Sequence, residues 1–112
     1  MIKLEEIGVD PSGTSLRGQV NVDYYPLVRL FGEPEPGDQY KTQAEWSLRL
    51  YDTGTGRSTV VTIYDWKQGD CYLGPGNGIP PEDVTVWNVG GYSGAAYYDL
   101  NALLEQAQEL AA

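Results

Sequence analysis

The sequence predicts an α+β domain: a mostly antiparallel sheet of about four to five strands, a C-terminal helix packed on one face, and a short helix at an edge. Several runs alternate between apolar and polar residues and are separated by turn residues, which is typical of strands. The C-terminal residues instead repeat apolar side chains at helical spacing. A length of 112 residues is that of one domain, residues 1–112.

Two strands are predicted near the N-terminus. Residues 2–7 carry spaced apolar side chains and are followed by a turn-forming cluster at residues 10–13, so they form a short strand or packed arm. Residues 15–22 alternate cleanly and predict a half-buried strand. Its apolar face contains Leu16, Gly18, Val20 and Val22.

A short helix and an acidic connector follow. Asp23 occupies an N-cap position, Leu27 and Phe31 recur at helical spacing, and Gly32 ends the pattern, which predicts a helix of about two turns. Residues 33–38 are polar and stiffened by proline. They are expected to form a solvated loop with three acidic side chains: Glu33, Glu35 and Asp38.

The centre of the chain predicts a β-hairpin. Residues 40–51 form the longest expected strand, with Trp46 on its apolar face. A loop with two glycines at residues 52–57 joins it to a second strand at residues 58–66. A short glycine-containing turn makes these two strands antiparallel neighbours.

A long loop, a strand and a helix complete the prediction. Residues 68–83 contain four glycines and three prolines and show no periodicity, and loops of this length usually bind or move something. Residues 84–89 form a strand, and Ser93 caps the final helix. The apolar stripe of that helix contains Ala96, Leu100, Leu103, Leu104, Ala107 and Ala111.

Charge and composition argue against several classes of protein. The chain carries sixteen acidic and seven basic side chains, a net charge of −9, with no basic patch, so direct binding to nucleic acid or to a membrane surface is not expected. Cys71 is the sole cysteine and forms no internal disulfide, which suits a reducing cytoplasm. No apolar run approaches the roughly 18 residues of a membrane span, and no signal peptide is recognisable.

The sequence lacks the usual parts of an enzyme. It contains no histidine and no serine or cysteine nucleophile paired with a base, so no catalytic residue is predicted. No spacing of acidic or cysteine residues typical of a metal site appears. No cofactor is expected either, because the glycines at residues 74–78 precede two prolines, whereas a phosphate-binding loop precedes a helix. Asp65, with Lys67 as its ionic neighbour, is the best single acid, which leaves a carboxylate-dependent enzyme as one alternative.

Aromatic side chains supply the candidate binding site. Trp66 and Trp87 lie at the ends of the strands that flank the long loop, and Tyr72 lies within it. These side chains either form an exposed aromatic edge or, for the two tryptophans, close the core beneath the loop, and both interpretations stay open. The remaining candidate binding residues at these strand ends are Asp65, Lys67 and Asn88.

Four ordered motifs between residues 27 and 91 resemble a family of small uncharacterised proteins encoded by tailed bacteriophages and prophages. They are FGEP, YK-x-x-x-EW, IYDWK and W-[HN]-[IV]-G-G, and Asn88 stands where relatives often have histidine. The resemblance brings no catalytic role. It implies a phage-encoded accessory protein that acts in the bacterial host cytoplasm, directed against host defence.

Three functional hypotheses follow. The first is a non-enzymatic protein that binds a host protein, as a counter-defence inhibitor, through the aromatic edge and the acidic surface of Glu33, Glu35 and Asp38. The second is a module that sequesters a small nucleotide-like ligand between Trp66, Tyr72 and Trp87. The third is the carboxylate-dependent enzyme. The oligomeric state is not predicted.

Overall fold

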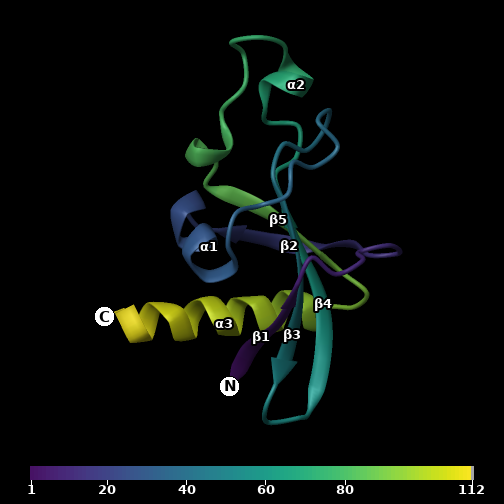
Figure 1. Ribbon diagram of the computed structural model, residues 1–112, viewed down its shortest axis with the longest axis vertical. Coiled ribbons are helices and arrows are strands. Elements are labelled where there is room, and N and C mark those ends of the chain that lie inside the picture. Colours follow the sequence, from purple (N-terminus) through teal and green to yellow (C-terminus); the bar gives the residue numbers. More distant parts are fainter. Residues whose placement is uncertain (112) are drawn as a thin grey trace. The chain divides into compact units, whose positions relative to one another are not determined.

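A computed structural model describes residues 1–111 and confirms the α+β prediction (Figure 1). Within these residues the chain forms one five-stranded antiparallel sheet of order β1-β3-β4-β5-β2. The strands are β1 Ile2–Ile7, β2 Ser15–Asn21, β3 Glu45–Asp52, β4 Arg57–Tyr64 and β5 Val86–Gly91. The helices are α1 Tyr24–Phe31, α2 Asp70–Leu73, the 3₁₀-helix η1 Pro81–Asp83, and α3 Ala95–Ala111.

The chain forms two compact units, and each is built from separate segments. The first contains Met1–Gly18, Ser47–Thr62 and the chain from Val89 onward, and the second contains Gln19–Trp46 and Ile63–Asn88. Since the segments of both units alternate along the sequence, neither unit is a continuous stretch of chain. The expectation of a single domain over residues 1–112 stays a prediction.

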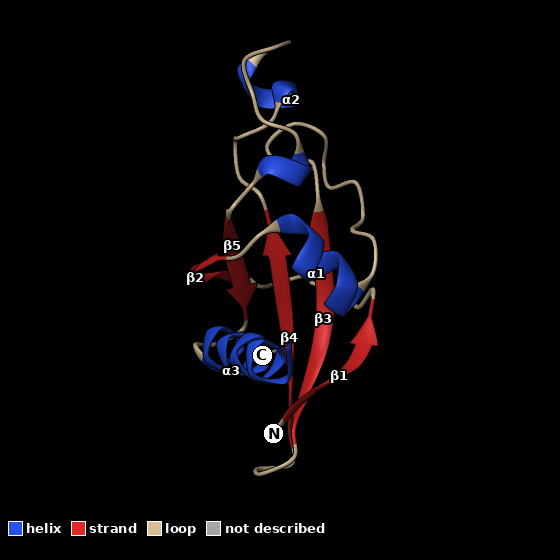
Figure 2. Ribbon diagram, turned by 90° about the vertical axis from the view of Figure 1, so that its left-hand side faces the viewer, coloured by secondary structure: helices blue, strands red, loops and turns tan. Residues whose placement is uncertain are grey.

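In the first unit, β1 pairs with β3 in antiparallel register, from Ile2 opposite Asp52 to Ile7 opposite Leu48. The register shifts at a β-bulge near Leu4. The short N-terminal stretch is thus a strand rather than a packed arm. Figure 2 shows β3 and β4 side by side and joined by a short loop, as the sequence predicts for a hairpin.

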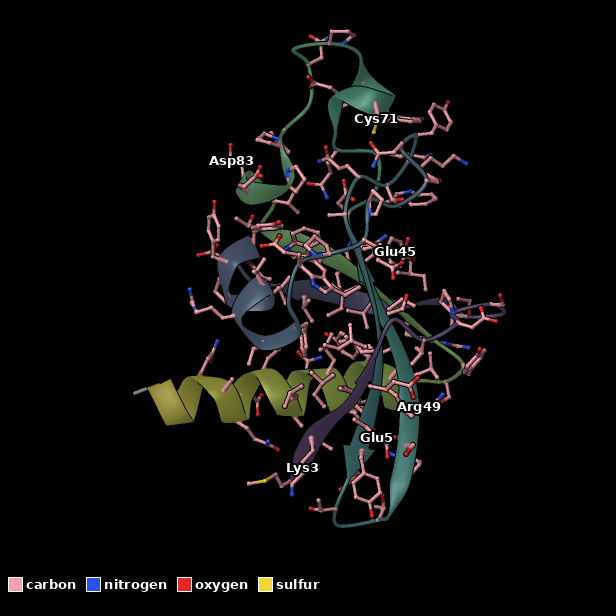
Figure 3. All side chains as sticks on the ribbon, viewed as in Figure 1. Lys3, Glu5, Glu45, Arg49, Cys71 and Asp83 are labelled. Carbon is pink, nitrogen blue, oxygen red and sulfur yellow. The ribbon has the colours of Figure 1, made fainter. Side chains whose placement is uncertain are left out.

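Charged side chains lie along β1 and β3. The guanidinium Nε of Arg49 lies 3.5 Å from the carboxylate of Glu6 and 4.0 Å from that of Glu5, and Figure 3 shows Glu5 and Arg49 close together. The Ser58 hydroxyl donates to the same Glu5 carboxylate at 2.9 Å. These pairs are exposed and contribute little to stability individually.

Helix α3 packs against the sheet within the first unit. The Gln106 amide binds both backbone groups of Ile2, accepting from its N–H at 2.9 Å and donating to its C=O at 3.1 Å. Asp99 is buried and accepts a hydrogen bond from the Thr59 hydroxyl at 3.1 Å. Its other oxygen lies 3.5 Å from the guanidinium of Arg57. The helix is therefore held by polar contacts as well as by its apolar stripe.

The predicted apolar stripe of α3 is buried at its start and half-buried further along. Ala96 and Leu100 have no exposed surface, and the helix begins with the Ser93 hydroxyl accepting from the Ala95 N–H at 3.3 Å, as expected for a cap. The next members of the stripe, Leu103, Leu104 and Ala107, are only half-buried. The Ala111 side chain lies outside the described residues.

Strand β2 is less buried than its alternation predicts. Leu16 is 57% exposed, whereas Val20 is buried. The reason is the place of β2 at the end of the strand order, because an edge strand has a neighbour on one side only. Period-2 alternation identified the strand correctly but not its position in the sheet.

Three aromatic rings form the centre of the second unit. The indoles of Trp46 and Trp87 meet edge to face with centroids 5.3 Å apart, and the Tyr24 ring lies 6.0 Å from one and 6.4 Å from the other. Each indole N–H is satisfied, Trp46 donating to the Gly32 C=O at 2.8 Å and Trp87 to the Val22 C=O at 3.0 Å. Such paired and hydrogen-bonded aromatics are strong core anchors.

Helix α1 begins and ends where the sequence indicates, but its N-cap differs. The Asp23 backbone is extended, as at an N-cap, yet its side chain makes no capping hydrogen bond. At the other end, Gly32 adopts a φ of 82°, which glycine accepts at low cost, and its N–H donates to the Val28 C=O at 2.8 Å.

The two central strands are shorter at one end than predicted. β3 begins at Glu45 rather than at Tyr40, because the Asp38 carboxylate organises a turn before it. That carboxylate accepts from the N–H groups of Tyr40 at 2.8 Å, Lys41 at 2.9 Å and Thr42 at 3.0 Å. β4 ends at Tyr64, two residues before the predicted boundary at residue 66.

Candidate functional site

Asp65 fixes the start of the long loop in the second unit. It is fully buried, and its Oδ1 accepts from the N–H of Gln43 at 2.8 Å and the N–H of Ala44 at 3.1 Å. Its Oδ2 is buried with no hydrogen-bond partner among the described residues. Asp65 was named as a candidate binding residue; it is buried, and it is a positioning residue that joins the loop to the segment before β3.

Two further contacts join these segments. The Lys67 N–H donates to the Lys41 C=O at 2.7 Å. The Cys71 thiol donates to the Tyr40 C=O at 3.2 Å, and Figure 3 shows the Cys71 side chain directed from α2 toward the neighbouring loop. Residues 65–71 are thus attached to residues 40–44 at three places.

The long loop is also braced internally. The Asp70 carboxylate accepts from the N–H groups of Gly76 at 3.1 Å and Gly78 at 2.8 Å, and these bonds hold the pKa of Asp70 below its usual range. The Gln43 amide donates to the Ile79 C=O at 2.8 Å. Residues 68–83, predicted as a long loop without periodicity, therefore contain α2 and η1 and are ordered by side-chain hydrogen bonds that periodicity does not reveal.

This bracing holds together five side chains, which we call the aromatic–lysine surface: Tyr40, Lys41, Trp66, Lys67 and Tyr72. Tyr40 is 56% and Trp66 41% exposed. The rings of Tyr40 and Tyr72 lie 5.3 Å apart. The ammonium of Lys41 lies 5.5 Å from the Trp66 ring centroid, and that of Lys67 lies 5.6 Å from Trp66 and 5.4 Å from Tyr72. These are cation–π distances.

The backbone beside this surface is strained. Lys67 has a φ of 58° and Gln39 a φ of 61°, in the left-handed region that favours glycine. Such a conformation costs a residue with a side chain about 1 kcal/mol or more, and it persists only where surrounding contacts determine it. For Lys67, that contact is its hydrogen bond to Lys41.

Asn88 connects to this surface through Tyr64. The Asn88 side-chain oxygen accepts from the Gln19 amide at 2.9 Å. Burial raises the pKa of Tyr64, a hydrogen bond with Asn88 opposes that shift, and the Glu45 charge adds to it. The Tyr64 ring lies edge-on to Trp66 at 6.1 Å. Asn88 itself is buried, so it acts on the surface only through its neighbours.

Trp87 does not belong to this surface. It is 0% exposed and packs against Trp46 and Tyr24, so the expected grouping of Trp66, Tyr72 and Trp87 does not form. The physical reason is strand alternation: Asn88 and Trp87 are adjacent in β5 and point to opposite faces. The interpretation that the tryptophans close the core holds for Trp87 and fails for Trp66.

Three residues of the surface region were missed by the sequence interpretation: Tyr40, Lys41 and Tyr64. Tyr40 and Lys41 were assigned to a strand, although Asp38 ahead of them is a common turn residue whose carboxylate can cap the backbone of the residues that follow. Tyr64 stands two residues before Trp66, which is the spacing of side chains on one strand face. Both signals are visible in the sequence.

The acidic surface is exposed but partly engaged in structure. The N–H groups of Thr42 and Tyr40 hold the pKa of Asp38 below its usual range. Glu33 accepts from the Tyr24 hydroxyl at 3.4 Å. The backbone of Glu35 pairs with that of Glu45 as an isolated antiparallel bridge. Of the three acids, Asp38 has the clearest structural role.

Glu45 makes stability depend on pH. Burial raises its pKa above the usual 4.5, and three neighbouring carboxylates raise it further: Glu35, Asp38 and Asp65. Because the folded pKa exceeds the unfolded one, the contribution of this group to stability is present below pH 4.5 and is lost as the pH rises through the folded pKa.

We therefore expect Glu45→Gln to be more stable than the native protein at neutral pH, with the difference disappearing in acid. Urea unfolding at a series of pH values measures this. Glu105→Gln, an exposed change on α3, corrects for the loss of one negative charge from an acidic protein. Equal effects of both substitutions at every pH would contradict the assignment.

Within residues 1–111, no group of three or more histidine, cysteine, aspartate or glutamate side chains is arranged to hold a metal ion. No helix in the same part of the chain has both the length and the apolar character needed to cross a membrane.

Comparison with protein-family models, with curated proteins and with solved structures finds no match to this chain. The fold and the site by themselves define an α+β protein that carries a braced surface of aromatic and cationic side chains.

Proposed function

We propose that this is a non-enzymatic binding protein whose partner is a protein of a bacterial host cell, bound through the aromatic–lysine surface. The observation that carries the proposal is the exposure of Trp66 and Tyr40 on a backbone held by the buried Asp65. Aromatic side chains are enriched at protein interfaces and supply most hot spots. A braced backbone lowers the entropy cost of binding.

The resemblance of four motifs to those of tailed-phage proteins supports a biological setting for this proposal. The YK motif contributes Tyr40 and Lys41 to the surface, and the IYDWK motif contributes Asp65, Trp66 and Lys67. Two of the four motifs therefore supply four residues of the aromatic–lysine surface and Asp65, which holds the backbone beneath it. We propose an accessory protein that acts in the host cytoplasm and inhibits a component of host defence.

The acidic side chains have a secondary role in this proposal. A net charge of −9 speeds the encounter with a basic region of a partner at low salt, while the contact itself is made by the aromatic–lysine surface. A carboxylate-dependent enzyme is not favoured, because Asp65 has no exposed surface with which to reach a substrate.

We expect Trp66→Ala and Tyr72→Ala each to abolish partner binding, and Tyr72→Ala to leave thermal stability nearly unchanged. Tyr72 lies in α2, within residues 68–83, and its ring contacts are with Tyr40 and Lys67, which are exposed. Affinity capture from bacterial lysate, followed by direct titration of the purified partner, measures binding. The matched control is Tyr98→Ala, which removes a 73% exposed ring from α3.

A second variant separates the two candidate surfaces. Glu33→Gln combined with Glu35→Gln removes acidic charge while keeping Asp38, whose carboxylate caps the turn that carries Tyr40 and Lys41. The proposal predicts slower association but retained binding. If this double variant loses binding while Tyr72→Ala keeps it, the acidic connector is the binding surface.

A further inference from the structure

We infer that Lys41, Trp66 and Lys67 also form a binding site for a free nucleotide. In this site the base stacks on the Trp66 ring and the two ammonium groups bind the phosphate. The site differs from the sequence-based hypothesis, since Trp87 is buried elsewhere in the core and takes no part. It involves a small ligand and does not depend on the existence of a protein partner.

The first argument is charge. Lys41 and Lys67 place their ammonium groups 5.5 and 5.6 Å from the Trp66 centroid. Among the described residues, the side-chain ion pairs involve Arg49 and Arg57 and neither of these lysines. In a chain with sixteen acidic and seven basic side chains, two cations that take part in none of these ion pairs between described residues converge on one exposed ring. Phosphate is the anion that such a pair of ammonium groups binds well.

The second argument is the ring itself. Trp66 is 41% exposed, and the Tyr64 ring supports it edge-on at 6.1 Å with an interplanar angle of 75°. Both ammonium groups lie over the Trp66 ring, so a stacking base takes the place of a flexible lysine side chain on the ring face, and that lysine turns toward the phosphate. Bases stack on exposed aromatic side chains of this kind. A ligand with a planar base and a phosphate group thus matches both the ring and the cations.

The third argument is backbone strain at Lys67. Its φ of 58° would suit glycine, yet the residue is a lysine whose ammonium reaches two rings, Trp66 and Tyr72. Strain of this kind is concentrated at ligand sites, where a particular side chain is needed despite its conformational cost. A lysine at this position is explained if its charge contacts a ligand.

A free nucleotide fits better than a nucleic-acid strand. The site offers two lysines, enough for the phosphate of one nucleotide, and the net charge of the protein is −9. A strand would bring further phosphates toward an acidic protein, and affinity for a polyanion depends on neutralising many of them. A free nucleotide and a nucleic-acid strand both offer a base and a phosphate, so the test compares a monophosphate with an oligonucleotide.

The test uses adenosine monophosphate as the probe and the indole N–H signals of the three tryptophans as the readout in NMR. The Trp46 and Trp87 signals come from buried, hydrogen-bonded N–H groups and serve as internal references. We expect the probe to shift the Trp66 signal selectively and saturably. Salt should weaken the binding, since both cations are at the surface.

Two variants and two matched controls test the lysines. Lys41→Gln and Lys67→Gly should each weaken binding of the probe by about ten-fold, as expected for loss of one charge-assisted contact. Lys67→Gly should in addition stabilise the fold, because it relieves the left-handed strain. Arg29→Gln removes an exposed charge from α1, and Gln39→Gly relieves the other left-handed position. Both controls should keep normal affinity.

Several outcomes would overturn the inference. One is the absence of a selective Trp66 shift. Another is equal affinity for inorganic phosphate and for adenosine monophosphate, which would mean that the base is not bound. Tighter binding of an adenine oligonucleotide than of the monophosphate would assign the site to a strand. By contrast, loss of partner capture in Tyr72→Ala with normal probe binding would support the inference, because it would show that the nucleotide site does not depend on the protein interface.

Discussion

Replacing Trp46 with alanine should lower the free energy of unfolding by about 3–5 kcal/mol, the range for deleting large aromatic side chains from a core. Trp46 is buried, and its ring meets the Trp87 ring edge to face at 5.3 Å. Its indole N–H also satisfies the Gly32 carbonyl at the end of α1. The alanine variant would leave a cavity beside Trp87 and a carbonyl without its donor. Urea denaturation followed by circular dichroism measures the loss.

The matched control for this prediction is Trp66→Ala. It removes the same side chain from a position that is 41% exposed, so we expect a loss of no more than about 1 kcal/mol. A loss below 1 kcal/mol for Trp46→Ala would mean that the aromatic centre of the second unit is assigned incorrectly.

Leu100→Asp should have a comparably large effect on the first unit, destabilising the protein by about 4 kcal/mol or more or preventing folding. Leu100 has no exposed surface, and it follows Asp99, the buried carboxylate that contacts Thr59 and Arg57. The substitution would bury a carboxylate at a position with no exposed surface, which is costly for an ionised group. Thermal unfolding and limited proteolysis measure the effect.

Substitutions at less buried positions of α3 should cost less stability than Leu100→Asp and serve as its controls. Leu103→Asp affects a half-buried residue and should be less damaging than Leu100→Asp. Glu105→Ala affects an exposed residue and should change stability by no more than about 0.5 kcal/mol. Equal losses from Leu100→Asp and Glu105→Ala would show that α3 is not packed through Leu100.

The candidate site combines residues that the sequence indicated with residues that it did not. Trp66, Tyr72 and Lys67 were expected at a binding edge, and the structure brings them together with Tyr40 and Lys41. Asp65 was expected in the same place but supports the backbone from within.

The sequence by itself determined the type and order of the strands and of α1 and α3, though not of α2 and η1, because hydrophobic periodicity, glycine turns and helix caps act over a few residues. It was sufficient for the hairpin, for α1 ending at Gly32, and for α3 beginning near Ser93. Strand alternation also placed Trp46 on a buried face correctly.

Only the tertiary structure decided which aromatic side chains are buried and how the long loop is ordered. Trp66 and Trp87 both stand near strand ends, but neighbours distant in sequence bury one of them and leave the other exposed. The start of the loop is fixed by single hydrogen bonds such as the one that the Gln43 N–H donates to the Asp65 carboxylate, across 22 positions of the chain. Periodicity does not reveal such contacts, because their energy depends on which segments the completed fold brings within hydrogen-bonding distance.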